Sequence, residues 1–147
     1  MVLRTTLITG FPGESEADFV ELCSFVEDIR FDRLGCFAYS AEEGTPAGER
    51  ADQINPEIRR RRAEIIMERQ YAIMEEKNAA QMGRSLEVLC EGYDPQSGVY
   101  VGRSYMDAPD IDSQIYFTSE LPCQEGEFYQ VTIDSAQNYD LMGHRGR

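Results

Sequence analysis

The cysteines are the residues with the most reactive side chains in this 147-residue chain, and their spacing argues against a metal cluster. The four lie far apart, with no CxxC or CxxxCxxC pattern, and the only histidine, His144, lies near the C-terminus. Iron–sulfur and zinc sites need several converging thiolates or imidazoles. We therefore predict no metal site and no catalytic residue here, and interpret these thiols as small, reduced, mostly buried side chains: Cys23, Cys36, Cys90 and Cys123.

A glycine-rich turn at residues 10–14 is the strongest candidate for a ligand-binding loop. It follows residues 3–9, whose types favour a β-strand, and its glycines and proline end that strand. Ser15 is predicted to cap the next helix, with Asp18 completing a capping box. Ligands in α/β folds bind beyond the carboxyl ends of strands, so this turn is a candidate binding edge.

The first part of the chain is expected to form a β-α-β unit. Apolar residues recur at helical spacing between Phe19 and Ile29, which predicts a helix that packs on a sheet. Residues 34–39 are typical of a buried strand. Two such strands joined by a helix form a parallel pair with a right-handed crossover.

A long helix is predicted to follow. Asn55 and Pro56 are typical of an N-cap and a first helical residue, and apolar pairs recur every seven residues at 65/66, 72/73 and 79/80. The basic run at residues 59–62 lies near several glutamates, which favours a solvated, salt-bridged face over an anion or RNA contact. Gly83 is predicted to end the helix, which divides the chain into domains at 1–83 and 84–147.

From residue 84 onward the pattern changes to alternation with a period of two. Five short strands are predicted, at residues 85–91, 99–105, 114–117, 128–134 and 139–142. Five antiparallel strands of this length predict a small closed barrel resembling an oligonucleotide-binding (OB) fold. Six aromatic residues could stack on bases, although about half are expected to fill the core: Tyr93, Tyr100, Tyr105, Tyr116, Phe117 and Tyr129.

The charge of the chain is strongly acidic. The sequence holds 27 acidic and 14 basic residues, for a formal net charge of −13, and residues 84–147 hold eleven acidic against four basic residues. Phosphate contacts come from lysine and arginine, so a nucleic-acid partner is disfavoured. A basic protein partner fits the sign better, although acidity could also serve solubility alone.

Three segments, in the expected order, resemble the radical S-adenosylmethionine (SAM) methylthiotransferases. Residues 3–14 (LRTTLITGFPGE) resemble a late strand and GFPGE turn of that family, and residues 33–47 (RLGCFAYSAEEGTPA) its next strand and loop. Residues 84–143 resemble its terminal TRAM domain. The closest resemblance is to the branch that methylthiolates an aspartate of a small-subunit ribosomal protein. The implied fold is α/β plus all-β: the last β-α-β portion of a radical-SAM partial TIM barrel, then a five-stranded OB-like TRAM barrel.

The resemblance also implies cofactors. The full-length enzyme would use SAM and two 4Fe-4S clusters, which the family holds with N-terminal cysteines that this sequence lacks, so the chain alone is expected to bind no cluster and to be inactive. Met1 lies directly before a predicted strand, which suggests a truncated reading frame. Glu14 is expected to brace the turn. The adenine side of SAM would be contacted by the backbone of Thr6, Ile8 and Gly10. Positions near the barrel mouth would be taken by Tyr39 and Ser40.

The same resemblance implies a partner. In the ribosomal-protein branch the TRAM domain holds the basic protein substrate, and residues 107–112 (DAPDID) resemble its acidic loop. The binding face is therefore expected to include, in exposed positions, Arg103, Tyr105, Asp107, Asp110 and Asp112.

Two alternatives stay open for the function. A tRNA methylthiotransferase should have a basic barrel, and a stand-alone protein-binding module would need no cofactor. Reduced cysteines and the lack of a signal peptide or long apolar span predict a cytoplasmic protein without membrane contact. We expect it to be a monomer.

Overall fold

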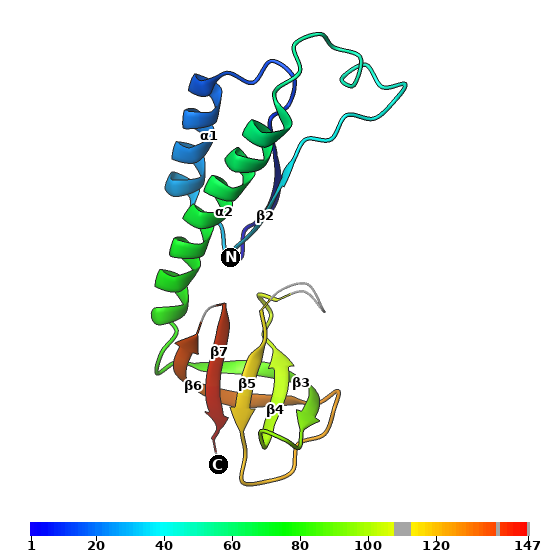
Figure 1. Ribbon diagram of the computed structural model, residues 1–147. Helices are drawn as coiled ribbons and strands as arrows, with labels where there is room; N and C mark the ends of the chain where they lie inside the picture. Colours follow the sequence, from blue (N-terminus) through cyan, green and yellow to red (C-terminus); the bar gives the residue numbers. More distant parts are fainter. Residues whose placement is uncertain (108–112, 138, 147) are drawn as a thin grey trace. The chain divides into compact units, whose positions relative to one another are not determined.

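The computed structural model describes residues 1–107, 113–137 and 139–146. Its contacts divide the chain into two compact units, Met1–Ile73 and Met74–Arg147 (Figure 1). The first unit is α/β and the second is a closed β-barrel. No helix in the described part of the chain combines the length and the apolar composition needed to cross a membrane.

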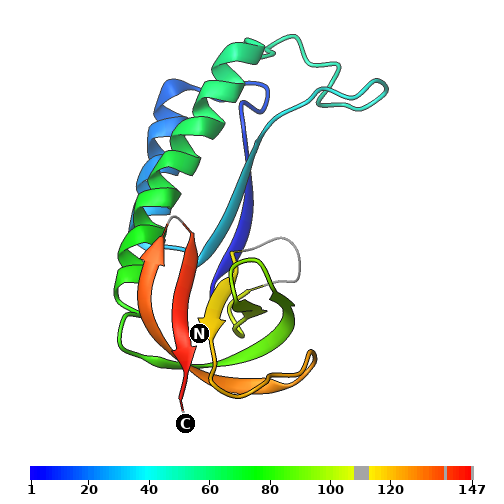
Figure 2. The ribbon, with the colours of Figure 1, turned by 60° about the horizontal axis from the view of Figure 1, so that its bottom comes forward.

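The first unit is built on a parallel pair of strands. Strand β1 (Arg4–Thr9) pairs with β2 (Arg33–Ala38), and helix α1 (Glu16–Ile29) connects them, as predicted. Helix α2 (Pro56–Ala79) lies beside α1 in both views of the ribbon (Figures 1 and 2). The two helices share one apolar cluster with one face of the strands, made of Phe19, Cys23, Val26, Phe31, Leu34, Ile66 and Ile73, with Leu3, Leu7 and Cys36 packed against it.

The helix starts form as their sequences predict. The backbone N–H of Asp18 donates to Ser15 Oγ at 3.1 Å, and the N–H of Ser15 donates back to the Asp18 carboxylate at 2.9 Å. This capping box satisfies two backbone donors that the first turn of α1 leaves without partners. At the start of α2 the Asn55 side chain accepts from the backbone N–H of Glu57 at 2.8 Å.

The apolar repeat predicted for α2 holds only in part. Ile66 and Ile73 are buried, but Ala79 and Ala80 are exposed, and the helix ends at Ala79 rather than at Gly83. Gly83 instead lies in the following turn, where its N–H donates to the carbonyl of Ile133 at 2.7 Å. The buried stripe of α2 recurs every three or four residues because the helix lies against one surface.

The second unit contains all five predicted strands. They are β3 (Ser85–Asp94), β4 (Val99–Arg103), β5 (Ile115–Thr118), β6 (Phe128–Gln137) and β7 (Asp140–Arg145). The closed order is β3-β4-β5-β7-β6, which confirms the small OB-like barrel. The expectation that all strands are antiparallel is wrong, because β5 and β7 pair in parallel. Strand β6 pairs with β3, and the β6–β7 hairpin then places β7 beside β5. The alternating pattern in the sequence does not reveal this pairing.

Alternate residues of these strands fill the barrel. The core consists of Leu86, Val88, Cys90, Ile115, Phe117, Val131, Ile133 and Leu141. Irregularities in register between Cys90 and Gly92, and between Ile133 and Ser135, provide the local bends that closure requires. Phe117 is buried and stacks on Tyr100, whereas Tyr93 is exposed. The aromatic residues are therefore divided between the core and the surface, as expected.

Candidate functional site at the carboxyl ends of β1 and β2

The residues predicted to contact a ligand through their backbone share one edge of β1. The carbonyls of Leu3 and Thr9 accept from the backbone N–H groups of Arg33 and Tyr39 on the β2 side. In a parallel ladder, a residue whose backbone carbonyl bonds to one neighbouring strand also points its N–H toward that strand. The residues that alternate with it point both backbone groups away from that strand. The backbone groups of Thr6 and Ile8 therefore face the other edge, which no strand of the described residues occupies.

The turn after β1 is held by Glu14. Its two carboxylate oxygens accept from the Gly10 backbone N–H at 3.0 and 3.1 Å. Gly10 has a φ of +75°, a left-handed conformation that glycine adopts without strain. The prediction that Glu14 braces this turn is confirmed, and the Gly10 N–H is already bonded within the protein.

Arg62 of α2 completes this bracing. Its side chain is buried, with 8% of the residue exposed. Nη1 donates to Glu14 Oε1 at 2.8 Å and to the Glu14 carbonyl at 3.1 Å, and Nη2 donates to Glu16 Oε2 at 3.2 Å. The guanidinium also lies 5.4 Å from the centre of the Phe19 ring. Such a pair is retained in a protein interior only where hydrogen bonds satisfy both ions.

Arg59, one turn earlier, holds the end of β2. Its guanidinium donates to the carbonyls of Tyr39 at 3.0 Å and Ile54 at 2.7 Å. Its own carbonyl accepts from Thr9 Oγ1 at 2.9 Å. The ends of both strands are therefore tied to the first turns of α2.

The interpretation of residues 59–62 as a solvated basic face is right for only half of the run. Arg60 and Arg61 are exposed and pair with Glu64 and Glu68. It is wrong for Arg59 and Arg62, which point toward the strand ends. Helical spacing could have identified these two arginines. Positions 59 and 62 lie three residues apart, on the same face of the helix as the buried Ala63 and Ile66.

Tyr39 lies beside the turn, and Ser40 is exposed next to it. The Tyr39 N–H donates to the Thr9 carbonyl at 2.7 Å, and its ring meets Phe11 edge-on at 5.4 Å. The structure thus places Gly10 and Tyr39 at the same end of the sheet, while Thr6 and Ile8 lie along the strand that leads to it.

Three thiols of this chain, those of Cys23, Cys36 and Cys90, are poor nucleophiles. Burial raises the pKa of Cys36 to about 11, and burial also raises the pKa values of Cys23 and Cys90. They are therefore protonated at neutral pH. All four cysteines are free, and within the described ranges no group of histidine, cysteine or acidic residues could hold a metal ion.

The residues proposed for partner binding on the barrel have different surroundings. Tyr105 is 77% exposed, and Arg103 Nε lies 3.5 Å from a Glu91 carboxylate oxygen. Asp110 and Asp112 lie outside the described residues. The expectation that Asp107 is exposed is wrong: it is 7% exposed, and its carboxylate accepts from the N–H and hydroxyl of Ser104 at 3.3 and 3.1 Å. Aspartate commonly closes a turn in this way, and the acidic composition of the loop masked that role.

Asp107→Ala is therefore expected to destabilise the barrel by about 1 to 3 kcal/mol, because it leaves buried Ser104 donors without their acceptor. Tyr105→Ala, two residues away and exposed, should change stability by less than about 0.5 kcal/mol. Urea unfolding followed by circular dichroism would measure both. Equal stability of the two variants would contradict a structural role for Asp107.

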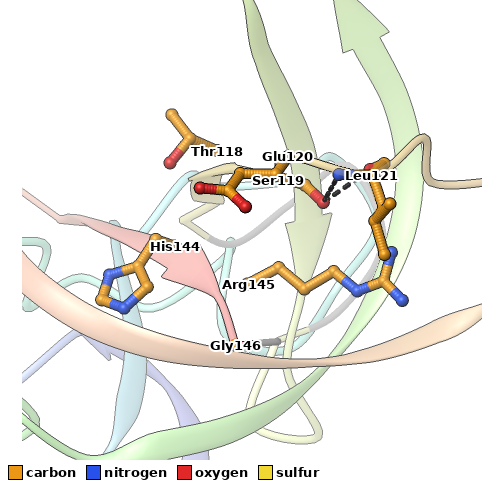
Figure 3. A pocket seen from close by; sticks show the side chains of 7 residues that line it. All are labelled: Thr118, Ser119, Glu120, Leu121, His144, Arg145 and Gly146. Carbon is orange, nitrogen blue, oxygen red and sulfur yellow. Dashed lines mark hydrogen bonds between the residues drawn. The ribbon is translucent and has the colours of Figure 1, made fainter.

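Two hollows that the sequence did not reveal lie among the described residues of the barrel. One has a volume of about 910 Å³ and lies between the ends of β5 and β7, lined by Thr118, Ser119, Glu120, Leu121, His144, Arg145 and Gly146 (Figure 3). Arg145 stacks on Tyr129 at 4.4 Å, and His144 Nδ1 lies 2.8 Å from the Asp134 carboxylate. The other, of about 590 Å³, runs along β3 and has the acidic residues Glu91, Asp94 and Glu125 in its wall.

Comparison with known proteins identifies the second unit first. Residues 82–145 match the TRAM domain family, so this is a chain with a TRAM barrel. Nearly the whole chain, 97% of it, is similar to ribosomal protein uS12 methylthiotransferase RimO, at 46% identity for the protein of Lachnoclostridium phytofermentans and 47% for that of Desulforamulus reducens. The protein of Desulfitobacterium hafniense is 49% identical over 96% of the chain. The chain is thus similar to these RimO proteins over nearly its whole length, and its second unit matches the TRAM domain, but it spans only about a third (32%) of the length of these relatives.

Proposed function

We propose that this chain is the part of a uS12 methylthiotransferase that contributes one wall of the SAM site and, through its TRAM barrel, holds the protein substrate. The proposal rests on the RimO-like sequence over 97% of the chain together with the acidic barrel. The modified group would be the β-carbon of an aspartate. A cytoplasmic, monomeric enzyme without membrane contact is part of the same proposal.

The strand ends fit the adenine side of SAM. The outward backbone groups of Thr6 and Ile8 offer hydrogen-bond donors and acceptors along β1, and Tyr39 offers an aromatic surface at the end of the sheet. Polar backbone groups near an aromatic surface are the usual composition of a site for a nucleoside. When bound, SAM and the two 4Fe-4S clusters would supply the radical and the sulfur. This chain would orient the nucleoside, and Gly10, Tyr39 and Ser40 would line its edge.

The barrel fits a basic protein better than RNA. Its acidic residues outnumber its basic ones, and a groove along β3 has three acidic side chains in its wall beside the exposed Tyr93. Complementary charge speeds the encounter with a basic partner and disfavours polyanions. We propose that Arg103 and Tyr105 border this binding face and that Asp110 and Asp112 contribute to it, whereas Asp107 is buried and bonded to Ser104.

Reversal of two exposed charges tests the substrate role. Glu125→Lys with Glu127→Lys should weaken binding of the purified chain to protein uS12 by about tenfold, or about 1.4 kcal/mol, and by less at high salt. Glu21→Lys with Asp28→Lys makes the same charge change at exposed positions of α1. This control should bind uS12 with an affinity within about twofold of that of the unmodified chain, a difference of less than about 0.5 kcal/mol. Fluorescence anisotropy at two salt concentrations, with circular dichroism as the folding control, measures both.

The same titration against tRNA separates the alternatives. Tighter binding of the unmodified chain to tRNA than to uS12 would favour a tRNA methylthiotransferase. Equal losses from both double variants would show that net charge, and not the barrel face, governs the interaction.

A further inference from the structure

We infer that Arg62 is a positioning residue for the SAM-binding edge: acting through Glu14, it fixes the Gly10 amide and with it the end of β1. The inference rests on the proposed function, because it assigns a role in SAM binding. It concerns only the first unit, which contains every residue involved.

The first step is the shared carboxylate. Glu14 accepts from the Gly10 N–H and from Arg62 Nη1, at 3.0 and 2.8 Å through the same oxygen, Oε1. The Glu14 side chain is 12% exposed and that of Arg62 10% exposed. Without the guanidinium, this carboxylate would be a nearly buried anion without a counterion, and it would turn toward water. That movement weakens its hold on Gly10.

The second step is the orientation of Arg62 itself. Glu16 accepts from its second nitrogen, the Glu14 carbonyl accepts from its first, and the Phe19 ring packs on its face. These contacts come from both sides of the capped start of α1. The guanidinium therefore has one orientation, which a lysine could not reproduce because its ammonium lacks the planar fork.

The third step connects this contact to the ligand edge. Gly10 directly follows β1, two residues after Ile8, whose backbone groups face the proposed SAM edge. Arg59, on the same side of α2 as Arg62, holds the Tyr39 carbonyl at the end of β2. The two arginines thus fix both strand ends against one helix, and a change at Arg62 reaches the edge through Glu14 and then Gly10.

The run of four arginines supplies its own control. Arg61 is adjacent in sequence and equally charged, but it is exposed, and its partners among the described residues are Glu64 and Glu68 on α2. Arg62→Met should therefore perturb the turn, and Arg61→Met should not. Arg62→Lys keeps the charge, so it should perturb the turn less than Arg62→Met does, but more than Arg61→Met.

The first measurement uses this chain. Hydrogen exchange followed by nuclear magnetic resonance should show the Gly10 amide exchanging at least tenfold faster in Arg62→Met, with the core amides of α1 unchanged, and no change in Arg61→Met. If Arg62→Met is not folded by circular dichroism, the same comparison is made with Arg62→Lys. Unchanged exchange at Gly10 in a folded Arg62 variant would overturn the inference.

The second measurement uses the cluster-loaded enzyme of which this chain is proposed to be a part. Equilibrium dialysis should show that Arg62→Met binds SAM about tenfold more weakly than the unmodified enzyme does. Arg62→Lys should show a smaller loss of affinity, and Arg61→Met should bind SAM as tightly as the unmodified enzyme. Equal SAM affinity in the unmodified enzyme and in Arg62→Met overturns the positioning role and leaves the proposed function standing. Failure of the unmodified enzyme to bind SAM overturns the proposed function itself.

Discussion

Gly10→Ala is expected to destabilise the first unit by about 3 kcal/mol or more, through backbone strain and a steric clash together. A Cβ at this position would lie 2.6 Å from Arg59 Cβ and 2.9 Å from Arg59 Cα. The second of these atoms belongs to the backbone of α2 and cannot move aside as a flexible side chain can. The left-handed φ of +75° adds about 1 to 2 kcal/mol for any L-residue.

Gly44→Ala is the matched control for this change. Gly44 has a similar φ of +81°, but nothing lies within 4 Å of the position that a Cβ would occupy. It should therefore show only the conformational cost of about 1 to 2 kcal/mol. Urea unfolding of both variants, with the amides of α1 and β2 as probes, measures the difference. A loss at Gly10 no larger than that at Gly44 would show that the strand end and α2 are not in close contact.

Local patterns predicted most of the secondary structure because the forces involved act over short stretches of sequence. The Ser15 capping box, the Asn55–Pro56 helix start and the alternation of the five barrel strands each depend on residues within about one turn or strand. The parallel pairing of β5 with β7 depends on the position of β6 in the barrel. That position is fixed by the pairing of β6 with β3, which is distant from it in sequence. Nothing within β5 or β7 encodes that choice.

The candidate site shows the same division. The Gly10 turn could be found from its glycines, and the role of Glu14 follows from its position four residues later. The partners of Arg59 and Arg62 could not be found in the same way, because residues 10–14 and 39 become their neighbours only once α2 has packed. Composition misled in two places: runs of charged residues suggested exposed side chains, yet Arg62 and Asp107 are both buried and hydrogen-bonded within the protein.

The barrel offers the second large effect. Phe117→Ala is expected to cost about 3 to 5 kcal/mol, because Phe117 is 0% exposed, stacks on Tyr100 at 5.5 Å and belongs to the apolar core of the barrel. A barrel of this size has a net stability of only a few kcal/mol, so this one substitution should leave much of it unfolded at 25 °C. Binding of protein uS12 should be lost with it if the barrel is the substrate-binding unit.

Phe128→Ala makes the same chemical change at the start of β6, where the ring is 61% exposed. It should cost less than about 1 kcal/mol and leave the barrel folded. Hydrogen exchange of the β3 and β6 amides reports on the barrel separately from the first unit, whose amides in α1 serve as an internal reference. If Phe117→Ala abolished uS12 binding while the β3 and β6 amides stayed protected, the ring would belong to the binding surface and not to the core. If uS12 binding survived loss of barrel protection, the substrate would be held by the first unit, and the role proposed for the TRAM barrel would be wrong.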